Sequence, residues 1–203
     1  MTAHAATHDE HAHQDPPDEF GVASTGKIGM WIFLCSDALS FSGLLLGYAI
    51  LRSGAETWPD PSDTLGINFT ALLTFLLICS SVTMVLAFAA ATEKNKAKTQ
   101  LYLGLTILGG VLFLLGQRYE YMELYHREMT FGSSNFMSTF YVITSFHGCH
   151  VFTGVTYLTV ILILVTKGHF VEDGNHSPIE LVGLFWHFVD LIWILVFTFV
   201  YLL

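Results

Sequence analysis

Five long apolar stretches constrain the fold of this 203-residue chain more than any other feature. A helix that crosses the hydrocarbon core of a bilayer needs about 20 such residues. Only 12% of the residues are charged, whereas an average soluble domain has roughly 25%. The stretches lack the two-residue alternation of barrel strands, which favours helices. The expected spans are residues 28–51, 67–91, 100–118, 136–166 and 180–203.

These spans predict an all-α polytopic membrane protein, a five-helix bundle at residues 27–203. We expect residues 1–26 to form a disordered, acidic tail, because they are polar and contain no apolar run. They also lack the basic and apolar regions of a signal peptide. The tail histidines have side chains suited to a divalent metal, but a solvated tail is the simpler interpretation. These histidines are His4, His8, His11 and His13.

Cysteine spacing and charge exclude several classes of protein. Cys35, Cys79 and Cys149 each lie inside an apolar run, without the paired spacing of disulfide scaffolds or zinc ribbons. The formal net charge of −9 leaves no basic surface for nucleic acid.

Lysine and arginine predict the orientation, because basic residues favour the cytoplasmic side of a membrane. A cytoplasmic N-terminus places all five lysines inside and all three arginines outside. The lysines are Lys27, Lys94, Lys96, Lys98 and Lys167, and the arginines are Arg52, Arg118 and Arg127.

Ionisable side chains on three spans share one depth near the bilayer centre, as judged from a rise of about 1.5 Å per residue. Glu120, beside Gln117, lies closer to the outer edge. An ionised group at that central depth costs about 2.5–3.5 kcal/mol or more, so such groups face the bundle and find partners. The members of the layer are Asp37, His147, His150, His187 and Asp190.

Three interpretations of this layer stay open on the residues alone. The side chains can form polar contacts between helices, each worth about 0.6 kcal/mol. Histidine and carboxylate are also suitable metal ligands. Chains of such groups carry protons in other membrane proteins. Residues three apart on a helix share a face, so His147 pairs with His150, and His187 with Asp190, on common faces.

Four segments resemble, in order and spacing, the helices of subunit III of haem-copper oxidases. FYVITSFHGCHVFTGVTYL resembles the family's HGxHVxxG helix, and FWHFVDLIWILVF resembles its closing WHFVDxxW helix. GMWIFLCSDALSF is similar to its GM…F…SE helix, and LLGQRYEYMEL to its Q…EY helix. The resemblance covers residues 28–203 and is closest to the short five-helix bacterial form, without two extra N-terminal helices.

The resemblance implies a supporting role without redox chemistry in this chain. In the family, haem and copper belong to subunits I and II, and subunit III stabilises subunit I and sustains proton uptake. It also holds phospholipids in a V-shaped cleft, for which the candidates here are Trp31, Asp37, Arg52 and Trp186. The family's intramembrane carboxylate is usually glutamate, and the matching residue here is Asp37, whose side chain is one methylene shorter.

We therefore expect a non-catalytic accessory subunit of a proton-pumping terminal oxidase in the bacterial cytoplasmic membrane. Its expected partners are subunit I above all, then subunit II, other oxidase subunits and structural phospholipids; membership of a respiratory supercomplex stays open. The alternatives are an accessory subunit of a nitric-oxide reductase-type complex, or a membrane metal-binding protein or transporter. We expect a buried polar network to fasten the last two spans, with Glu120 capping it. Its members are His147, His150, His187 and Asp190.

Overall fold

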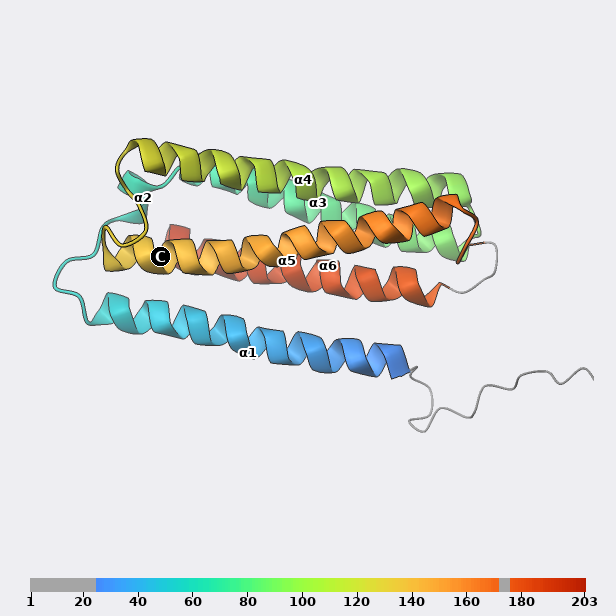
Figure 1. Ribbon diagram of the computed structural model, residues 1–203, viewed down its shortest axis with the longest axis horizontal. Helices are drawn as coiled ribbons and strands as arrows, with labels where there is room; N and C mark the ends of the chain where they lie inside the picture. The colour runs from blue at the N-terminus through green and yellow to red at the C-terminus, as the bar shows by residue number, and fades with distance from the viewer. Residues whose placement is uncertain (1–24, 172–175) are drawn as a thin grey trace, which may run out of the picture.

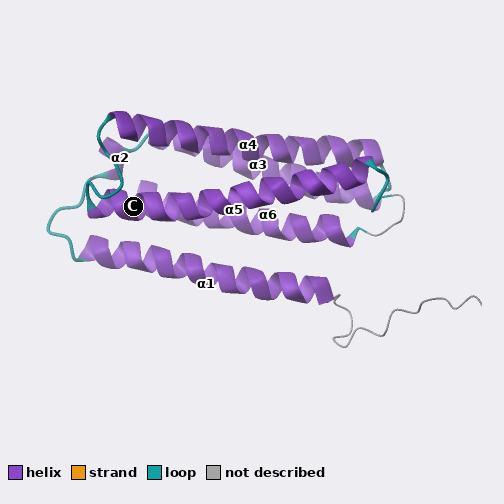
Figure 2. Cartoon of the chain, in the orientation of Figure 1, coloured by secondary structure: helices purple, strands orange, loops and turns teal. Residues whose placement is uncertain are grey.

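The computed structural model describes residues 25–171 and 176–203, and these residues form helices and loops without strands (Figure 2). The predicted tail therefore lies almost entirely outside the described residues. The elements are α1 (Thr25–Ser53), α2 (Pro61–Thr64), α3 (Ile67–Thr92), α4 (Lys96–His126), α5 (Asn135–Thr166), α6 (Ser177–Val196) and a terminal π-helix, η1 (Phe197–Leu202).

The five long helices run side by side, and α1 lies along one flank of the group formed by α3 to α6 (Figure 1). Helix α1 packs against α5 and α6. All five helices are long and apolar enough to cross a membrane, the last of them counted from Ser177 to Leu202. The predicted all-α, five-span fold class is confirmed.

Helix α4 is longer than the expected span of residues 100–118. It runs from Lys96 to His126, and it ends before Glu128, whose backbone has the left-handed φ of 58°. Hydropathy detects only the part of a helix that enters hydrocarbon, so it misses the polar turns at either end. Helices α1, α3 and α5 lie within three residues of the expected ends, and so does the last span when η1 is counted with α6, from Ser177 to Leu202.

Two tryptophans of α6 hold it against α3. The indole N–H of Trp186 donates to Oγ of Ser80 at 3.1 Å, and that of Trp193 donates to Oγ1 of Thr74 at 2.9 Å. Both rings are buried, with 1% of their surface exposed. A buried indole needs such a partner for its single donor. The later tryptophan of α6 contacts the earlier hydroxyl residue of α3, so the two helices run antiparallel.

Small residues make room for these rings. A Cβ at Gly110 of α4 would lie 2.5 Å from Trp186, and one at Gly154 of α5 would lie 3.0 Å from the same ring. Gly116 of α4 is similarly close to Leu73 of α3. Helices in a membrane gain most of their association energy from close packing, so these glycines set the spacing within α3 to α6.

The outer surface of the bundle is apolar. Large side chains stay exposed on every long helix, which is the opposite of the pattern in a soluble monomer and fits a multi-pass membrane protein. Examples are Leu39 (75% exposed), Phe75 (61%), Leu101 (59%), Phe152 (64%) and Leu191 (57%).

Substituting Gly110 by Ala tests this packing. The added methyl group meets the rigid ring of Trp186 and a methyl group of Val155 at 2.6 Å, so we expect a loss of about 1–3 kcal/mol of unfolding free energy. Gly104→Ala on the same helix is the matched control, because nothing lies within 4 Å of its Cβ position. Thermal or denaturant unfolding in detergent measures both, and equal stability of the two variants would contradict this packing.

Candidate functional site

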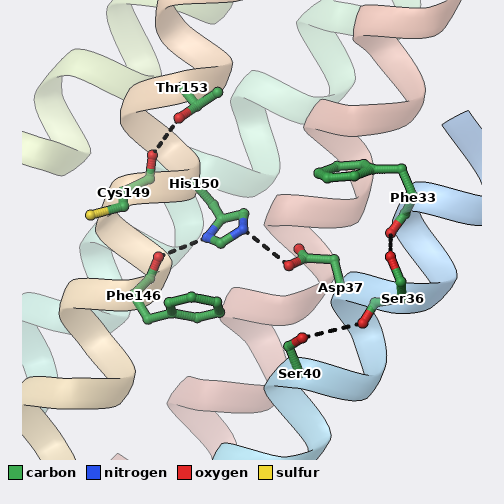
Figure 3. Close-up of polar contacts among 8 residues, drawn as sticks. All are labelled: Phe33, Ser36, Asp37, Ser40, Phe146, Cys149, His150 and Thr153. Atoms are coloured by element: carbon green, nitrogen blue, oxygen red, sulfur yellow. Dashed lines mark hydrogen bonds and ion pairs between the residues drawn. The ribbon is translucent and has the colours of Figure 1, made fainter.

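A carboxylate and an imidazole meet between α1 and α5. Nε2 of His150 lies 3.1 Å from Oδ1 of Asp37, and Nδ1 of His150 lies 2.8 Å from the carbonyl oxygen of Phe146 (Figure 3). Asp37 is 8% exposed. The sequence places these residues at one depth, and the structure brings them into contact.

These two hydrogen bonds fix how many protons the pair holds. The carbonyl oxygen of Phe146 can only accept, so Nδ1 of His150 must carry a proton and donate it. Either Nε2 also carries a proton and donates to an ionised Asp37, or a protonated Asp37 donates to a neutral ring. In both arrangements the pair has zero net charge and shares one proton. Such a neutral pair avoids the cost of an isolated ion in hydrocarbon.

Aromatic rings enclose the pair. The ring of Phe41 lies 5.2 Å from that of His150, and the ring of Phe146 lies 4.7 Å from it. Oδ2 of Asp37 is buried and has no hydrogen-bond partner among the described residues. The low dielectric of these surroundings strengthens the one contact that Asp37 makes.

The contact between Asp37 and His150 is the middle one of three that hold α1. Near the start of α1, Nζ of Lys27 lies 2.8 Å from a carboxylate oxygen of Glu180 on α6. Near its end, the guanidinium of Arg52 donates to the carbonyl oxygen of Leu203. Lys27 and Glu180 are each about a third exposed, and exposed ion pairs contribute about 0–1 kcal/mol. The contact between Asp37 and His150 is more buried than that between Lys27 and Glu180, with 9% and 16% of its two side chains exposed.

His187 and Asp190 of α6 both contact Ser81 of α3. Oγ of Ser81 lies 2.6 Å from Nδ1 of His187, and the same hydroxyl is a hydrogen-bond neighbour of Asp190. The two α6 residues make no hydrogen bond to each other, and Oδ1 of Asp190 is buried without a partner among the described residues. Ser81 of α3 therefore links His187 and Asp190, which the sequence places on one face of the last helix.

His147 lies inside a cage of aromatic rings. It is 0% exposed, and the rings of Trp193 and Phe113 lie 4.8 Å and 5.7 Å from its own. Neither ring nitrogen has a hydrogen-bond partner in the described part of the chain. His147 packs as an apolar ring and is not joined to His150 by a hydrogen bond.

Glu120 joins three elements near the other end of the bundle. Its Oε1 accepts a hydrogen bond from Thr70 of α3 at 3.1 Å, and its Oε2 accepts one from Tyr201 of η1 at 2.9 Å. The neighbouring Gln117 donates instead to the carbonyl oxygen of Thr144 on α5, at 2.8 Å. Glu120 thus holds the C-terminal π-helix against α3 and α4.

The polar side chains consequently form separate contacts instead of the single expected network. Each contact joins a different set of helices: α1 with α5, α3 with α6, and α3 with α4 and η1. The sequence does not predict the partners Ser81, Thr70 and Tyr201. Hydroxyl residues are common in all the spans, so no signal in the sequence distinguishes these three.

The proposed lipid-cleft candidates lie in different surroundings. Trp31 is 56% exposed and lines a groove of about 400 Å³ between α1 and α6, with His187 on its wall. Arg52 lies at the end of α1, where it contacts the C-terminal residue. Trp186 is 1% exposed, and it therefore has no surface to offer a lipid.

Metal-binding geometry is absent from the described residues. In residues 25–171 and 176–203, no three histidine, cysteine, aspartate or glutamate side chains are arranged so that they could hold an ion. The tail histidines lie outside the described residues.

Comparison with known proteins identifies the relatives of this bundle. The family model for cytochrome c oxidase subunit III matches residues 12–203. A probable cytochrome c oxidase subunit 3 of Rickettsia prowazekii is 35% identical over 96% of this chain and 72% of its own length. Cytochrome c oxidase subunit 3 of Synechocystis is 35% identical over 95% and 79%, and that of Thermostichus vulcanus is 34% identical over 96% and 92%.

Substituting Asp37 by Ala tests the buried contact. This change leaves Nε2 of His150 without its partner, which costs about 1–3 kcal/mol of unfolding free energy. Asp37→Asn should retain most of the stability, because the amide N–H can donate to Nε2 of a neutral ring. Unfolding in detergent measures both variants, with Ser36→Ala on the exposed face of α1 as the control. A stability of Asp37→Ala equal to that of wild type would refute the contact.

Proposed function

Because this chain belongs to the cytochrome c oxidase subunit III family, we propose that it is a non-catalytic accessory subunit of a proton-pumping terminal oxidase. The complex reduces O₂ to water, and the haem and copper that this requires are held by its other subunits. This chain stabilises subunit I, binds phospholipids and supports proton uptake.

The contact between Asp37 and His150 is the observation that best supports this role. Groups that do chemistry on a substrate need access to it, whereas this pair is enclosed by helices α1 and α5 and by phenylalanine rings. A pair that shares one proton can pass it from one partner to the other without change of net charge. It is therefore suited to fasten α1 within the membrane without a buried net charge.

The exposed apolar surface supports the proposed partners. An apolar helix surface in a membrane contacts either lipid or the helices of other proteins. Helix α1 has one face that makes no contacts within the described bundle. We propose that subunit I is the main protein partner, with subunit II and other subunits nearby. The bundle would lie in a bacterial cytoplasmic membrane with its N-terminus in the cytoplasm, as the lysine distribution indicates.

Purification through an affinity tag on this chain tests the proposal. In mild detergent we expect a haem-containing partner to co-purify and to give a reduced-minus-oxidised visible spectrum with oxidase activity. Removing this chain from the complex should preserve the haem spectrum and the initial rate of O₂ reduction. It should, however, make activity decline several-fold faster during turnover, because proton supply is no longer sustained.

Three results would contradict parts of the proposal. Recovery of the chain without any haem protein would refute the role as an oxidase subunit. Co-purification with a complex that reduces nitric oxide and not O₂ would establish the alternative complex. Immediate loss of all O₂ reduction when the chain is removed, with the haem spectrum intact, would contradict a non-catalytic role.

A further inference from the structure

Arg118 of α4 is an exposed cation with no partner in the part of the chain that the structure describes. Arg52 contacts Leu203, and Arg127 forms an ion pair with Glu123 at 2.8 Å. Arg118 makes no such contact with any described residue and points away from the packed interior. A cation on the outer face of a membrane helix either extends to the interface, where water and lipid phosphates lie, or pairs with a negative group of a neighbour.

The position of Arg118 along α4 indicates where that group lies. The 31 residues of α4 span about 46 Å at 1.5 Å per residue, compared with a hydrocarbon core of about 30 Å. If α4 is centred in the bilayer, roughly 8 Å extends beyond the core at each end. Arg118 lies eight residues before His126, about 12 Å from the helix end. It is therefore just inside the core boundary, within side-chain reach of the lipid phosphates.

A groove of about 420 Å³ runs along α4 and α5 beside Arg118. Arg118, Tyr121 and Ser145 line the part nearer the helix end at His126, whereas Leu114 and Phe152 line the part nearer the bilayer centre. The groove therefore has its charged residue at the outer end, and its deeper part is mostly apolar, with the hydroxyl of Thr153 donating to the carbonyl oxygen of Cys149. A phospholipid has the same order of groups, with its phosphate outermost and its acyl chains toward the centre.

Neighbouring side chains fix the polar end of this groove. The hydroxyl of Tyr121 lies 2.7 Å from Oγ1 of Thr144 and 3.1 Å from Oγ of Ser145. A Cβ at Gly148 would lie 3.0 Å from Oε1 of Gln117, so the glycine keeps the middle of the groove open. The two hydroxyl groups are held in place before any ligand arrives, Tyr121 on the wall formed by α4 and Ser145 on the wall formed by α5, which lowers the entropic cost of binding.

We propose that this groove between α4 and α5 binds one phospholipid, with its phosphate on Arg118 and the hydroxyl of Ser145. One acyl chain would lie along Leu114 and Phe152. A carboxylate on a partner helix would also neutralise Arg118, and the experiment below distinguishes the two. The proposal deepens the phospholipid binding proposed above and rests on it.

Lipid retention by the purified complex tests the site. The full chain, with everything that co-purifies, is placed in nanodiscs of dioleoylphosphatidylglycerol and then released into detergent. Native mass spectrometry counts the lipids that stay bound. Arg118→Gln removes the charge-assisted contact, and Cys149→Trp fills the deeper groove from an exposed position. We expect each variant to retain this one lipid about tenfold less than wild type does.

Control variants introduce the same new side chains away from the groove. Arg127→Gln at the C-cap of α4 and Val160→Trp on the exposed surface of α5 should retain the lipid as wild type does. Wild-type retention by Arg118→Gln would overturn the proposal. Loss of a protein subunit with an unchanged lipid count would overturn it too, and would assign Arg118 to a partner's carboxylate. The lipid count does not depend on haem, so its failure is distinct from failure of the oxidase assignment.

Discussion

The hydrogen bond between His150 and Asp37 connects α1 to the rest of the bundle at mid-depth, and the position of α1 depends on it. Helix α1 buries few side chains, and its contacts at either end are exposed or lie at the chain terminus. In hydrocarbon there is no water to compete for the pair or to replace a lost partner. The shared proton makes the contact neutral, so α1 is held without a buried net charge.

The need of a polar group for a partner in hydrocarbon explains the other polar contacts and the outward position of Arg118. Trp186, Glu120 and His187 each contact a hydroxyl group on α3, which makes α3 the source of partners for the core of the bundle. Arg118 faces outward and has no partner of this kind within the described residues, which is the basis of the lipid site proposed above. The buried polar side chains of this protein thus connect its helices to one another, whereas Arg118 lies on the outer surface, where a ligand can reach it.

Apolar length was enough to predict the five helices, because each run is long enough to cross a bilayer on its own. It could not locate the ends of α4, where Glu120 and its neighbours remain helical beyond the apolar run. Spacing along one helix identifies residues that share a face, such as His187 and Asp190, but not the neighbouring helix that faces them. Ser81 lies 106 residues from His187 in sequence, and only the packing of α3 against α6 brings them together.

The central claim is that Asp37 and His150 act as one coupled unit that holds α1, and a double-mutant cycle measures this directly. The unfolding free energies of wild type, Asp37→Ala, His150→Ala and the double variant give the coupling between the two side chains. Ordinary hydrogen bonds between membrane helices average about 0.6 kcal/mol. Because this contact is shielded and shares a proton, we predict a coupling above about 1 kcal/mol. A coupling indistinguishable from zero would contradict the account.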